Sequence, residues 1–167
     1  MSKKILVSDK LSEEGLAILK ADKNVQIDIK TGLTEDEIIK IISDYDAILV
    51  RSGTKVTKKI IDAGKNLKII GRAGVGVDNV DVPAASSKGI YVVNAPEGNT
   101  ISTAEQTMAL MLALARKTPP AHHSMDQGNW DRKSFEGIEL YDKTLGIIGL
   151  GRIGKEVAHR AKAFGMK

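Results

Sequence analysis

The sequence predicts an α/β protein whose first part is a doubly wound parallel sheet and whose second part begins another α/β domain. Two observations carry this prediction. Short apolar runs alternate with helix-forming segments between residues 4 and 93, an order typical of parallel strands joined by helical crossovers. Further along, a G-x-G-x-x-G stretch at 149–154 follows another apolar run and precedes a helical pattern.

The first part, residues 1–98, is expected to be a flavodoxin-like unit of five strands joined by helices. Its apolar runs are short and rich in Ile, Leu and Val, which suits strands that are buried on both faces. Thr34 and Glu37 have the spacing of a capping box, which predicts a helix start. The expected strands are 4–8, 25–29, 47–50, 67–71 and 90–93, and the expected helices are 12–21, 34–43, 57–63 and 81–87.

The second part, residues 99–167, is expected to be the start of a Rossmann dinucleotide-binding domain. Turn-forming residues at 94–100 indicate a hinge before it. A strand is predicted at 145–148, directly before the glycine motif, and a helix at 155–164, directly after it.

A long helix is predicted over 102–117, opened by a second capping-box pattern and stopped by Pro119 and Pro120. Its residues 108–115 are apolar nearly all round. We therefore expect this helix to be buried, either inside the chain or against a partner subunit.

Composition narrows the function classes. The chain has 167 residues, 42% hydrophobic and 28% charged, which is typical of a soluble globular protein. The net charge of +4 is scattered along the chain and aromatic residues make up 4%, so we expect neither nucleic acid nor membrane as a partner. The absence of cysteine excludes disulfides and thiolate sites. No metal-ligand spacing is visible, and a cytoplasmic protein is expected.

Each glycine of the 149–154 motif has a mechanical role in dinucleotide binding. Gly149 allows the tight turn out of the strand, Gly151 lets a pyrophosphate approach the backbone, and Gly154 lets the helix lie close to the sheet. The N–H groups and the positive dipole end of the helix would then hold the anion.

Two arginines follow neighbouring strands of the predicted sheet. Arg51 and Ser52 come directly after the strand that ends at Val50, and Arg72 and Gly74 belong to the glycine-rich stretch after the next strand. Ligands of open parallel sheets bind at the carboxyl ends of the strands, and a guanidinium fork binds a carboxylate or a phosphate. The sequence therefore predicts a site for a small anion at this edge; surface arginines without a ligand are the plain alternative.

The histidines are weaker candidates for chemistry. His122, His123 and His159 have no acidic residue at a spacing that would orient them as general bases. We expect them to lie on the surface or to pack on helices, and no catalytic residue is predicted in this chain.

These motifs together resemble the D-isomer-specific 2-hydroxyacid dehydrogenases along essentially the whole chain. The resemblance rests on the blocks 50–56, 71–81, 94–100, 104–105, 128–133 and 140–154. It implies a substrate-binding domain over 1–98, hinged to an NAD-binding domain that begins at 99. The contexts of Arg51, Ser52 and Arg72 favour, within the family, a phosphorylated 2-hydroxy acid as the small anionic substrate.

The resemblance also implies roles for individual residues. Arg51, Ser52, Arg72, Gly74 and Asn99 would contact the substrate. Around NAD, Val75 would lie near the nicotinamide end, and Arg152 and Ile153 would offer backbone N–H groups to the pyrophosphate beside Gly149, Gly151 and Gly154. Residues 102–133 resemble the segment through which subunits of the family pair.

Several parts of the family pattern are missing from the sequence. The resemblance places the catalytic His, its paired Glu, the carboxylate-binding Arg and the acidic residue for the ribose beyond Lys167, and completes the first domain with a segment that returns from the C-terminus. We therefore expect a front piece of a longer oxidoreductase, inactive by itself, with exposed apolar surface after about residue 102. Two alternatives stay open: a dehydrogenase for glyoxylate, hydroxypyruvate or lactate-type acids, and a non-catalytic dinucleotide-sensing module.

Overall fold

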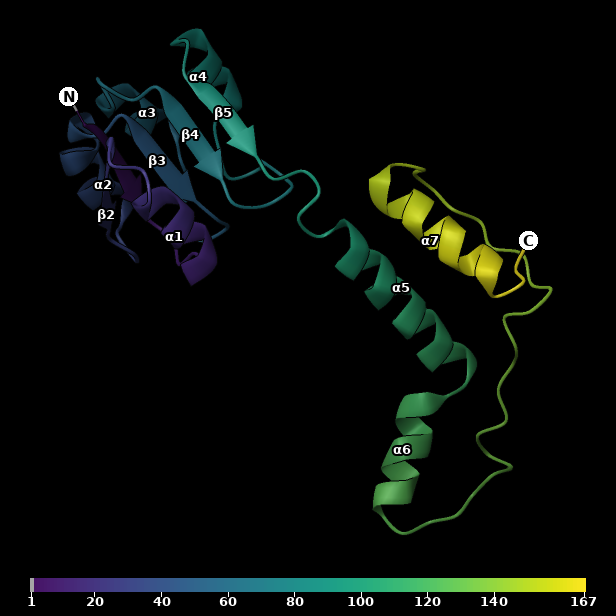
Figure 1. Cartoon of the computed structure of the whole chain (residues 1–167). Helices are drawn as coiled ribbons and strands as arrows, with labels where there is room; N and C mark the ends of the chain where they lie inside the picture. The colour runs from purple at the N-terminus through teal and green to yellow at the C-terminus, as the bar shows by residue number, and fades with distance from the viewer. Residues whose placement is uncertain (1) are drawn as a thin grey trace. The chain divides into compact units, whose positions relative to one another are not determined.

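The computed structural model describes residues 2–167 and divides them into two compact units, the first ending at Gly98 and the second beginning at Asn99 (Figure 1). The first unit has the predicted α/β architecture. Its five strands form one parallel sheet in the order β2-β1-β3-β4-β5, the strand order of flavodoxin-like folds. The strands are β1 (Lys3–Val7), β2 (Val25–Ile29), β3 (Ala47–Val50), β4 (Ile69–Arg72) and β5 (Tyr91–Asn94).

Helices connect these strands, and local sequence explains where each helix begins. α1 (Glu13–Lys20) is capped by the Ser12 hydroxyl, and α4 (Val82–Ser87) by the Asp81 carboxylate. α2 (Glu35–Ile41) opens with the predicted capping box, in which Thr34 and Glu37 bond to each other's backbone N–H. A 3-10 turn, η1 (Ile42–Asp44), follows α2, and α3 (Lys58–Ala63) follows β3.

The core of the first unit lies on one face of the sheet. Leu6, Ile48 and Ile70 are neighbours across β1, β3 and β4, and none of their side chains is exposed. They pack against Ile38 of α2 and Ile60 of α3, together with Ala85 of α4. Burying branched apolar side chains on this scale is the main force that holds the unit together.

The opposite face of the sheet is covered less completely than a doubly wound arrangement predicts. α1 packs there against β2, whereas the outward residues of the last two strands remain open. Ile69 is 41% exposed, Tyr91 73% and Val93 51%. Ile69 pairs with Tyr91 in the ladder and alternation places Val93 on the same side, so these three residues form one apolar surface.

The described part of the second unit contains α5 (Thr100–Ala115), α6 (Thr118–Asp126) and α7 (Arg152–Ala163). α5 packs along α7 (Figure 1). Their small core consists of Ala104, Met108 and Val157, with partly buried neighbours that include Leu145 and Ile147. No helix among the described residues is long and apolar enough to cross a membrane.

The structure corrects three predictions about α5. The helix begins at Thr100, not at Ser102, and no side-chain cap forms at its start, because the backbone is already helical before the predicted capping box. It ends at Ala115, and Pro119 lies in the first turn of α6, which begins at Thr118, instead of stopping α5, since proline fits the first turn of a helix. Of the two predicted ways to bury the helix, burial inside this chain is incomplete, because Leu110 is 61% exposed and Leu114 82%. Burial against a partner subunit stays a prediction.

The predicted strand at 145–148 is also wrong for the described residues. Here the chain carries no strand assignment. The Leu145 N–H donates to the Lys167 carbonyl at 2.8 Å, and the Lys167 N–H donates to the Lys143 carbonyl at 2.8 Å. This is the bonding pattern of a single parallel pair, and an extended segment becomes a strand only when a ladder continues along it.

Candidate functional site

The carboxylate of Asp9, a residue that follows β1, holds the loop after β3 by hydrogen bonds. Its oxygens accept hydrogen bonds from the Arg51 N–H at 2.6 Å, the Thr54 N–H at 3.0 Å and the Thr54 hydroxyl at 2.8 Å. A Cβ at position 53 would come within 2.8 Å of an Asp9 oxygen, so a larger residue there would push the carboxylate out of its present position. Asp9 therefore occupies the nest of N–H groups of this loop, and the exposed Arg51 and Ser52 side chains remain for a ligand.

The charge of Asp9 is stabilised by this arrangement. Burial raises the pKa of the carboxyl, but the hydrogen bonds from the Thr54 N–H, the Arg51 N–H, the Thr54 hydroxyl and the Gly53 N–H together outweigh burial. The pKa of Asp9 consequently lies below its usual value. An ionised carboxylate thus fixes the loop that presents Arg51 at neutral pH.

Arg72 ends β4 and is paired in the sheet with Val50, so it lies at the same edge as Arg51. Its Nε donates to Oδ1 of Asn79 at 3.2 Å. The Asn79 Nδ2 donates to the carbonyl oxygens of Arg51 at 2.6 Å and Thr54 at 2.7 Å. One amide therefore joins the side chain of the second arginine to the backbone of the loop that carries the first.

The loop after β4 folds back around the Arg72 side chain and is tied to β5. A Cβ on Gly74 would lie 2.6 Å from Nη1 of Arg72, so a larger residue there would force the guanidinium to shift. The Gly74 carbonyl accepts from the Ala95 N–H at 3.0 Å, and the Val75 carbonyl accepts from Nδ2 of Asn94 at 2.6 Å. These contacts fix the glycine-rich loop at the end of the sheet.

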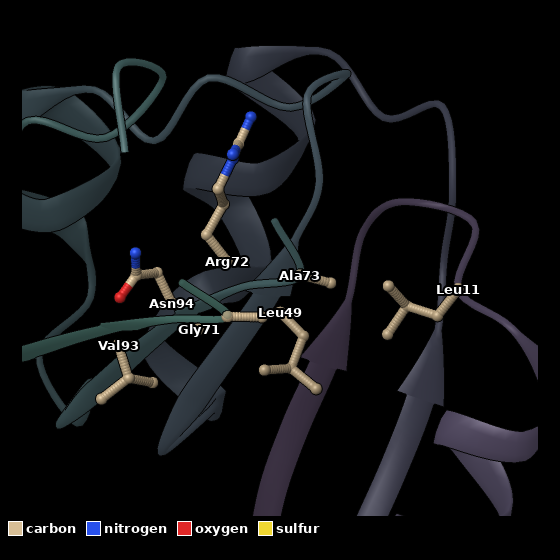
Figure 2. Close-up of a pocket in the computed structure, with 8 residues that line it drawn as sticks. Leu11, Leu49, Gly71, Arg72, Ala73, Val93 and Asn94 are labelled. Atoms are coloured by element: carbon tan, nitrogen blue, oxygen red, sulfur yellow. The ribbon is translucent and has the colours of Figure 1, made fainter. Parts of the chain in front are cut away.

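A shallow apolar cavity of about 220 Å³ lies beside this edge on the less covered face of the sheet (Figure 2). Leu49 and Val93 project to the side of the sheet opposite to the Arg72 side chain, and Gly71 between them has no space for a Cβ against Leu49. The cavity is lined by Leu11, Leu49, Gly71, Arg72, Ala73, Val93, Asn94 and Ala95. The edge therefore offers cationic donors on one side and an apolar hollow on the other.

In the second unit, the glycine motif leads directly into α7. Gly149 has φ +92°, a conformation that favours glycine. A Cβ on Gly154 would collide with the Gly149 carbonyl, whereas nothing lies within 4 Å of a Cβ built on Gly151. Gly151 is the N-cap of α7, and no side chain of the described residues caps this helix. The first N–H groups of any helix have no carbonyl acceptor in the helix itself.

This geometry fits the pyrophosphate of a dinucleotide. The backbone at Gly151 is open to an approaching anion, and the start of a twelve-residue helix carries partial positive charge. Gly149 is constrained by its positive φ, and Gly154 by the close approach of the Gly149 carbonyl.

Of the five residues predicted to contact substrate, the first unit brings together Arg51, Ser52, Arg72 and Gly74. Asn99 belongs to the second unit, where it is the N-cap of α5 and its carbonyl accepts from the Thr103 N–H at 2.9 Å.

Sequence reasoning missed the residues that hold these loops: Asp9, Asn79 and Asn94. A usable signal was present, because short polar side chains near the carboxyl ends of strands commonly bond to neighbouring backbone.

His122 and His123 in α6 make local contacts. His122 lies 3.3 Å from Asp126, and His123 lies 3.2 Å from Gln127; in each pair the partner is one helical turn away on an exposed surface. Among the described residues, no group of three His, Cys, Asp or Glu side chains is arranged to hold a metal ion.

Comparison with known proteins assigns the chain to a class that suits this geometry. Residues 5–164 match the D-isomer specific 2-hydroxyacid dehydrogenase catalytic domain, and the chain belongs to that family. It is 60% identical over 164 residues to D-3-phosphoglycerate dehydrogenase of Synechocystis, covering 98% of this chain and 29% of the relative. The enzymes of that name from Methanocaldococcus jannaschii and Homo sapiens are 58% and 50% identical, with 98% and 99% of this chain and 31% of each relative covered. The chain thus spans under a third of the length of these curated relatives.

Solved structures of the family have the same fold. A D-lactate dehydrogenase from Aquifex aeolicus, complexed with NAD and lactic acid, aligns with a TM-score of 0.85 at 28% identity, covering 99% of this chain and 50% of that one. An NAD⁺-bound 3-phosphoglycerate dehydrogenase from Entamoeba histolytica aligns with a TM-score of 0.76 at 33% identity, covering all of this chain and 53% of that one.

Proposed function

We propose that this chain forms the substrate-binding part and the first dinucleotide-binding segment of a D-3-phosphoglycerate dehydrogenase. The full enzyme would oxidise 3-phospho-D-glycerate to 3-phosphohydroxypyruvate with NAD, the first step of L-serine biosynthesis. Identity of 50–60% to enzymes of that name from a bacterium, an archaeon and a mammal supports this proposal. Among the structural observations, the joined arginines Arg51 and Arg72 at one sheet edge carry it.

The substrate has a carboxylate and a phosphate, and both groups suit the donors at this edge. The Arg51 guanidinium and Ser52 hydroxyl project from the β3 loop, and Arg72 extends from β4 beside the Gly74 backbone. Hydrogen bonds to charged groups contribute about 1.5–3 kcal/mol each. Because Asp9 already fills the N–H nest of the β3 loop, side chains rather than that nest would bind the anion.

NAD, when bound, supplies the acceptor for the hydride that leaves the alcohol carbon. In this chain Gly149, Gly151 and Gly154 would shape its pyrophosphate site, and the backbone N–H groups of Arg152 and Ile153 would donate to it. The family resemblance assigns Val75 to the nicotinamide end and Asn99 to the substrate.

We expect the 167-residue chain to bind without turnover. Oxidation of an alcohol requires a base that takes the hydroxyl proton, and His122 and His123 are engaged with neighbours on an exposed helix. Mixing the chain with NAD and 3-phospho-D-glycerate should therefore produce no NADH absorbance.

Calorimetric titration of the chain tests substrate binding directly. We expect 3-phospho-D-glycerate to bind at least about 10-fold more tightly than D-glycerate, because only the former carries the phosphate. Arg51→Ala and Arg72→Ala should each weaken binding by about 10- to 100-fold. Lys23→Ala is the matched control, since it removes one positive charge just before β2, at the opposite edge of the same sheet. Equal affinity for the two acids would contradict the proposal.

Another D-2-hydroxyacid dehydrogenase is the second candidate, favoured by the TM-score of 0.85 with the D-lactate dehydrogenase from Aquifex aeolicus. Indifference to the substrate phosphate in the titration would support it. A non-catalytic dinucleotide-sensing module would instead require NADH binding that changes association with a partner.

We also propose self-association through residues 102–133. The support is exposed apolar surface in this segment: Leu114 is 82% exposed, Trp130 75% and Leu110 61%. Sedimentation of the chain should give a mass above 18.0 kDa, and Leu114→Glu should lower it to that of the monomer. A monomeric wild-type chain at high concentration would contradict this assignment.

A further inference from the structure

We propose that Asn79 is a positioning residue for the anion site, one that couples Arg72 to the loop carrying Arg51 so that both arginines act as one binding unit. This inference rests on the proposed function, because it concerns the same sheet edge. It goes further because it proposes that an uncharged amide side chain determines how the two arginines are placed relative to each other.

The hydrogen bonds of Asn79 leave its side-chain amide only one orientation. Oδ1 accepts from the Arg72 Nε at 3.2 Å, and Nδ2 uses both hydrogens, to the Arg51 carbonyl at 2.6 Å and the Thr54 carbonyl at 2.7 Å. In the flipped orientation, an NH₂ group would face a guanidinium and a carbonyl oxygen would face two carbonyl oxygens. Every polar atom of the amide is therefore committed to joining the two loops.

Asn79 is itself anchored to the core of the first unit. Its carbonyl accepts from the Val56 N–H at 2.8 Å, and the Asp81 N–H donates to the Val56 carbonyl at 3.0 Å. These bonds belong to an isolated parallel bridge between Val56 and Val80, whose side chains are 1% and 7% exposed. The amide consequently projects from a fixed point between the two loops.

Asp9 and Asn79 hold opposite polar groups of the same loop. Asp9 accepts from the N–H groups of Arg51 and Thr54, and Asn79 donates to the carbonyl groups of the same two residues. The loop after β3 is therefore fixed from both sides. Of the two anchors, only Asn79 also contacts an arginine side chain, so it alone relates one arginine to the other.

This coupling matters for binding because an unrestrained arginine must lose side-chain freedom when it meets an anion. With Nε held by Asn79 and Nη1 packed against the Gly74 backbone, Arg72 has already lost much of that freedom. Its terminal Nη groups are the donors it keeps for a ligand. Pre-organisation of this kind raises affinity without adding a contact.

Two substitutions separate positioning from simple support of the fold. Asn79→Ala removes all three hydrogen bonds. Asn79→Asp keeps an acceptor for Arg72 but loses both donations to the β3 loop, and its charge would pair with the guanidinium that should meet the ligand. Thr34→Ala is the matched control, because it breaks the capping box of α2 in the same unit and leaves the site intact.

The experiment is a calorimetric titration of each variant chain with 3-phospho-D-glycerate, alongside urea unfolding. We expect Asn79→Ala and Asn79→Asp to weaken binding by about 10-fold or more, with Thr34→Ala unchanged in affinity. In an Arg72→Ala background, Asn79→Ala should have a smaller effect than in the wild type, because the side chain it positions is gone. Equal losses of affinity in Asn79→Ala and Thr34→Ala, or additive effects with Arg72→Ala, would overturn the inference.

A measurement on the unmutated chain applies even if the Asn79 variants fail to fold. The Nε–H proton of Arg72 should exchange with water more slowly than that of the exposed Arg132 in NMR spectra, because it is bonded to Asn79. Equal exchange rates would overturn the inference. Wild-type chain that binds no 3-phospho-D-glycerate would overturn the proposed function and the binding role of Asn79 with it, whereas tight binding by Asn79→Ala would overturn the inference alone.

Discussion

The two units differ in how their proposed anion sites are built. In the first unit, short polar side chains tie the loops at the sheet edge: Asp9 holds the β3 loop, Asn79 joins it to Arg72, and Asn94 holds the β4 loop. In the second unit, the loop before α7 is shaped by backbone, with Gly149 at φ +92° and an open approach at Gly151. The first site thus depends on polar side chains that hold its loops, and the second on glycines whose lack of a side chain leaves the backbone accessible.

The two units also differ in how their cores are built. A contiguous group of fully buried side chains, including Leu6, Ile48 and Ile70, supports the sheet of the first unit. In the second unit, Ala104, Met108 and Val157 form a much smaller buried group. The difference indicates that the first unit has the larger core, whereas α5 and α7 expose surface suited to further packing.

The largest expected loss in the free energy of unfolding comes from a substitution in the core of the first unit. Ile48→Ala deletes a fully buried side chain at the centre of the sheet, and we expect a loss of about 2–5 kcal/mol in the free energy of unfolding. Ile138→Ala, at a second-unit residue that is 59% exposed and lies outside the proposed self-association segment, should change it by less than about 0.5 kcal/mol. Urea unfolding followed by circular dichroism measures both; equal losses would show that the two units do not differ as described.

Substitutions of Gly151 and Gly154, at the start of α7, should separate effects on stability from effects on cofactor binding. Gly154→Ala places a Cβ against the Gly149 carbonyl, so the turn must shift and the second unit should lose stability. Gly151→Ala meets no protein atom within 4 Å and should leave the thermal midpoint nearly unchanged, yet it should abolish the binding of NAD to the chain.

Thermal melting and NAD titration of the two variants provide the comparison, each serving as the other's control. Retained NAD affinity in Gly151→Ala would show that the pyrophosphate does not approach the backbone at this residue.

A smaller effect should appear as a pH dependence of the β3 loop. Because hydrogen bonds hold the pKa of Asp9 below its unfolded value of about 3.9, the stabilisation it gives is fully present above that pH. It is lost as the pH falls through the lower folded value. Amide exchange of Arg51 and Thr54, corrected for the intrinsic pH dependence of exchange, should therefore accelerate in acid.

Asp9→Asn should show the faster exchange already at neutral pH and little further change below pH 4. Glu139→Gln, at an exposed carboxyl of the second unit, is the control and should behave as the wild type does. An acid-induced change that persists undiminished in Asp9→Asn would assign the titration to another group.

Much of this architecture was predictable from local sequence. Apolar runs such as 47–50 have the pattern of buried parallel strands, and the spacing of Thr34 and Glu37 predicts the start of a helix. Arg51 and Arg72 could be placed at one edge because the carboxyl ends of parallel strands meet there.

The features that the sequence did not predict correctly depend on contacts between residues that are distant in the chain. The segment 145–148 has a strand-like sequence, but pairing decides whether a strand forms, and among the described residues only Lys167 pairs with this segment. The amide of Asn79 likewise reaches carbonyls 25 and 28 residues away. Short-range patterns cannot indicate which loops such a side chain will join.

The most direct test of the anion site is a chemical-shift map of the chain during titration with 3-phospho-D-glycerate. We expect the signals of the Ser52 and Gly74 backbone amides and of the Arg72 side-chain Nε–H to shift together, with one affinity. D-glycerate should shift them only at higher concentration. If these three signals stay still while signals elsewhere in the chain move, the edge formed by β3 and β4 is not the binding site.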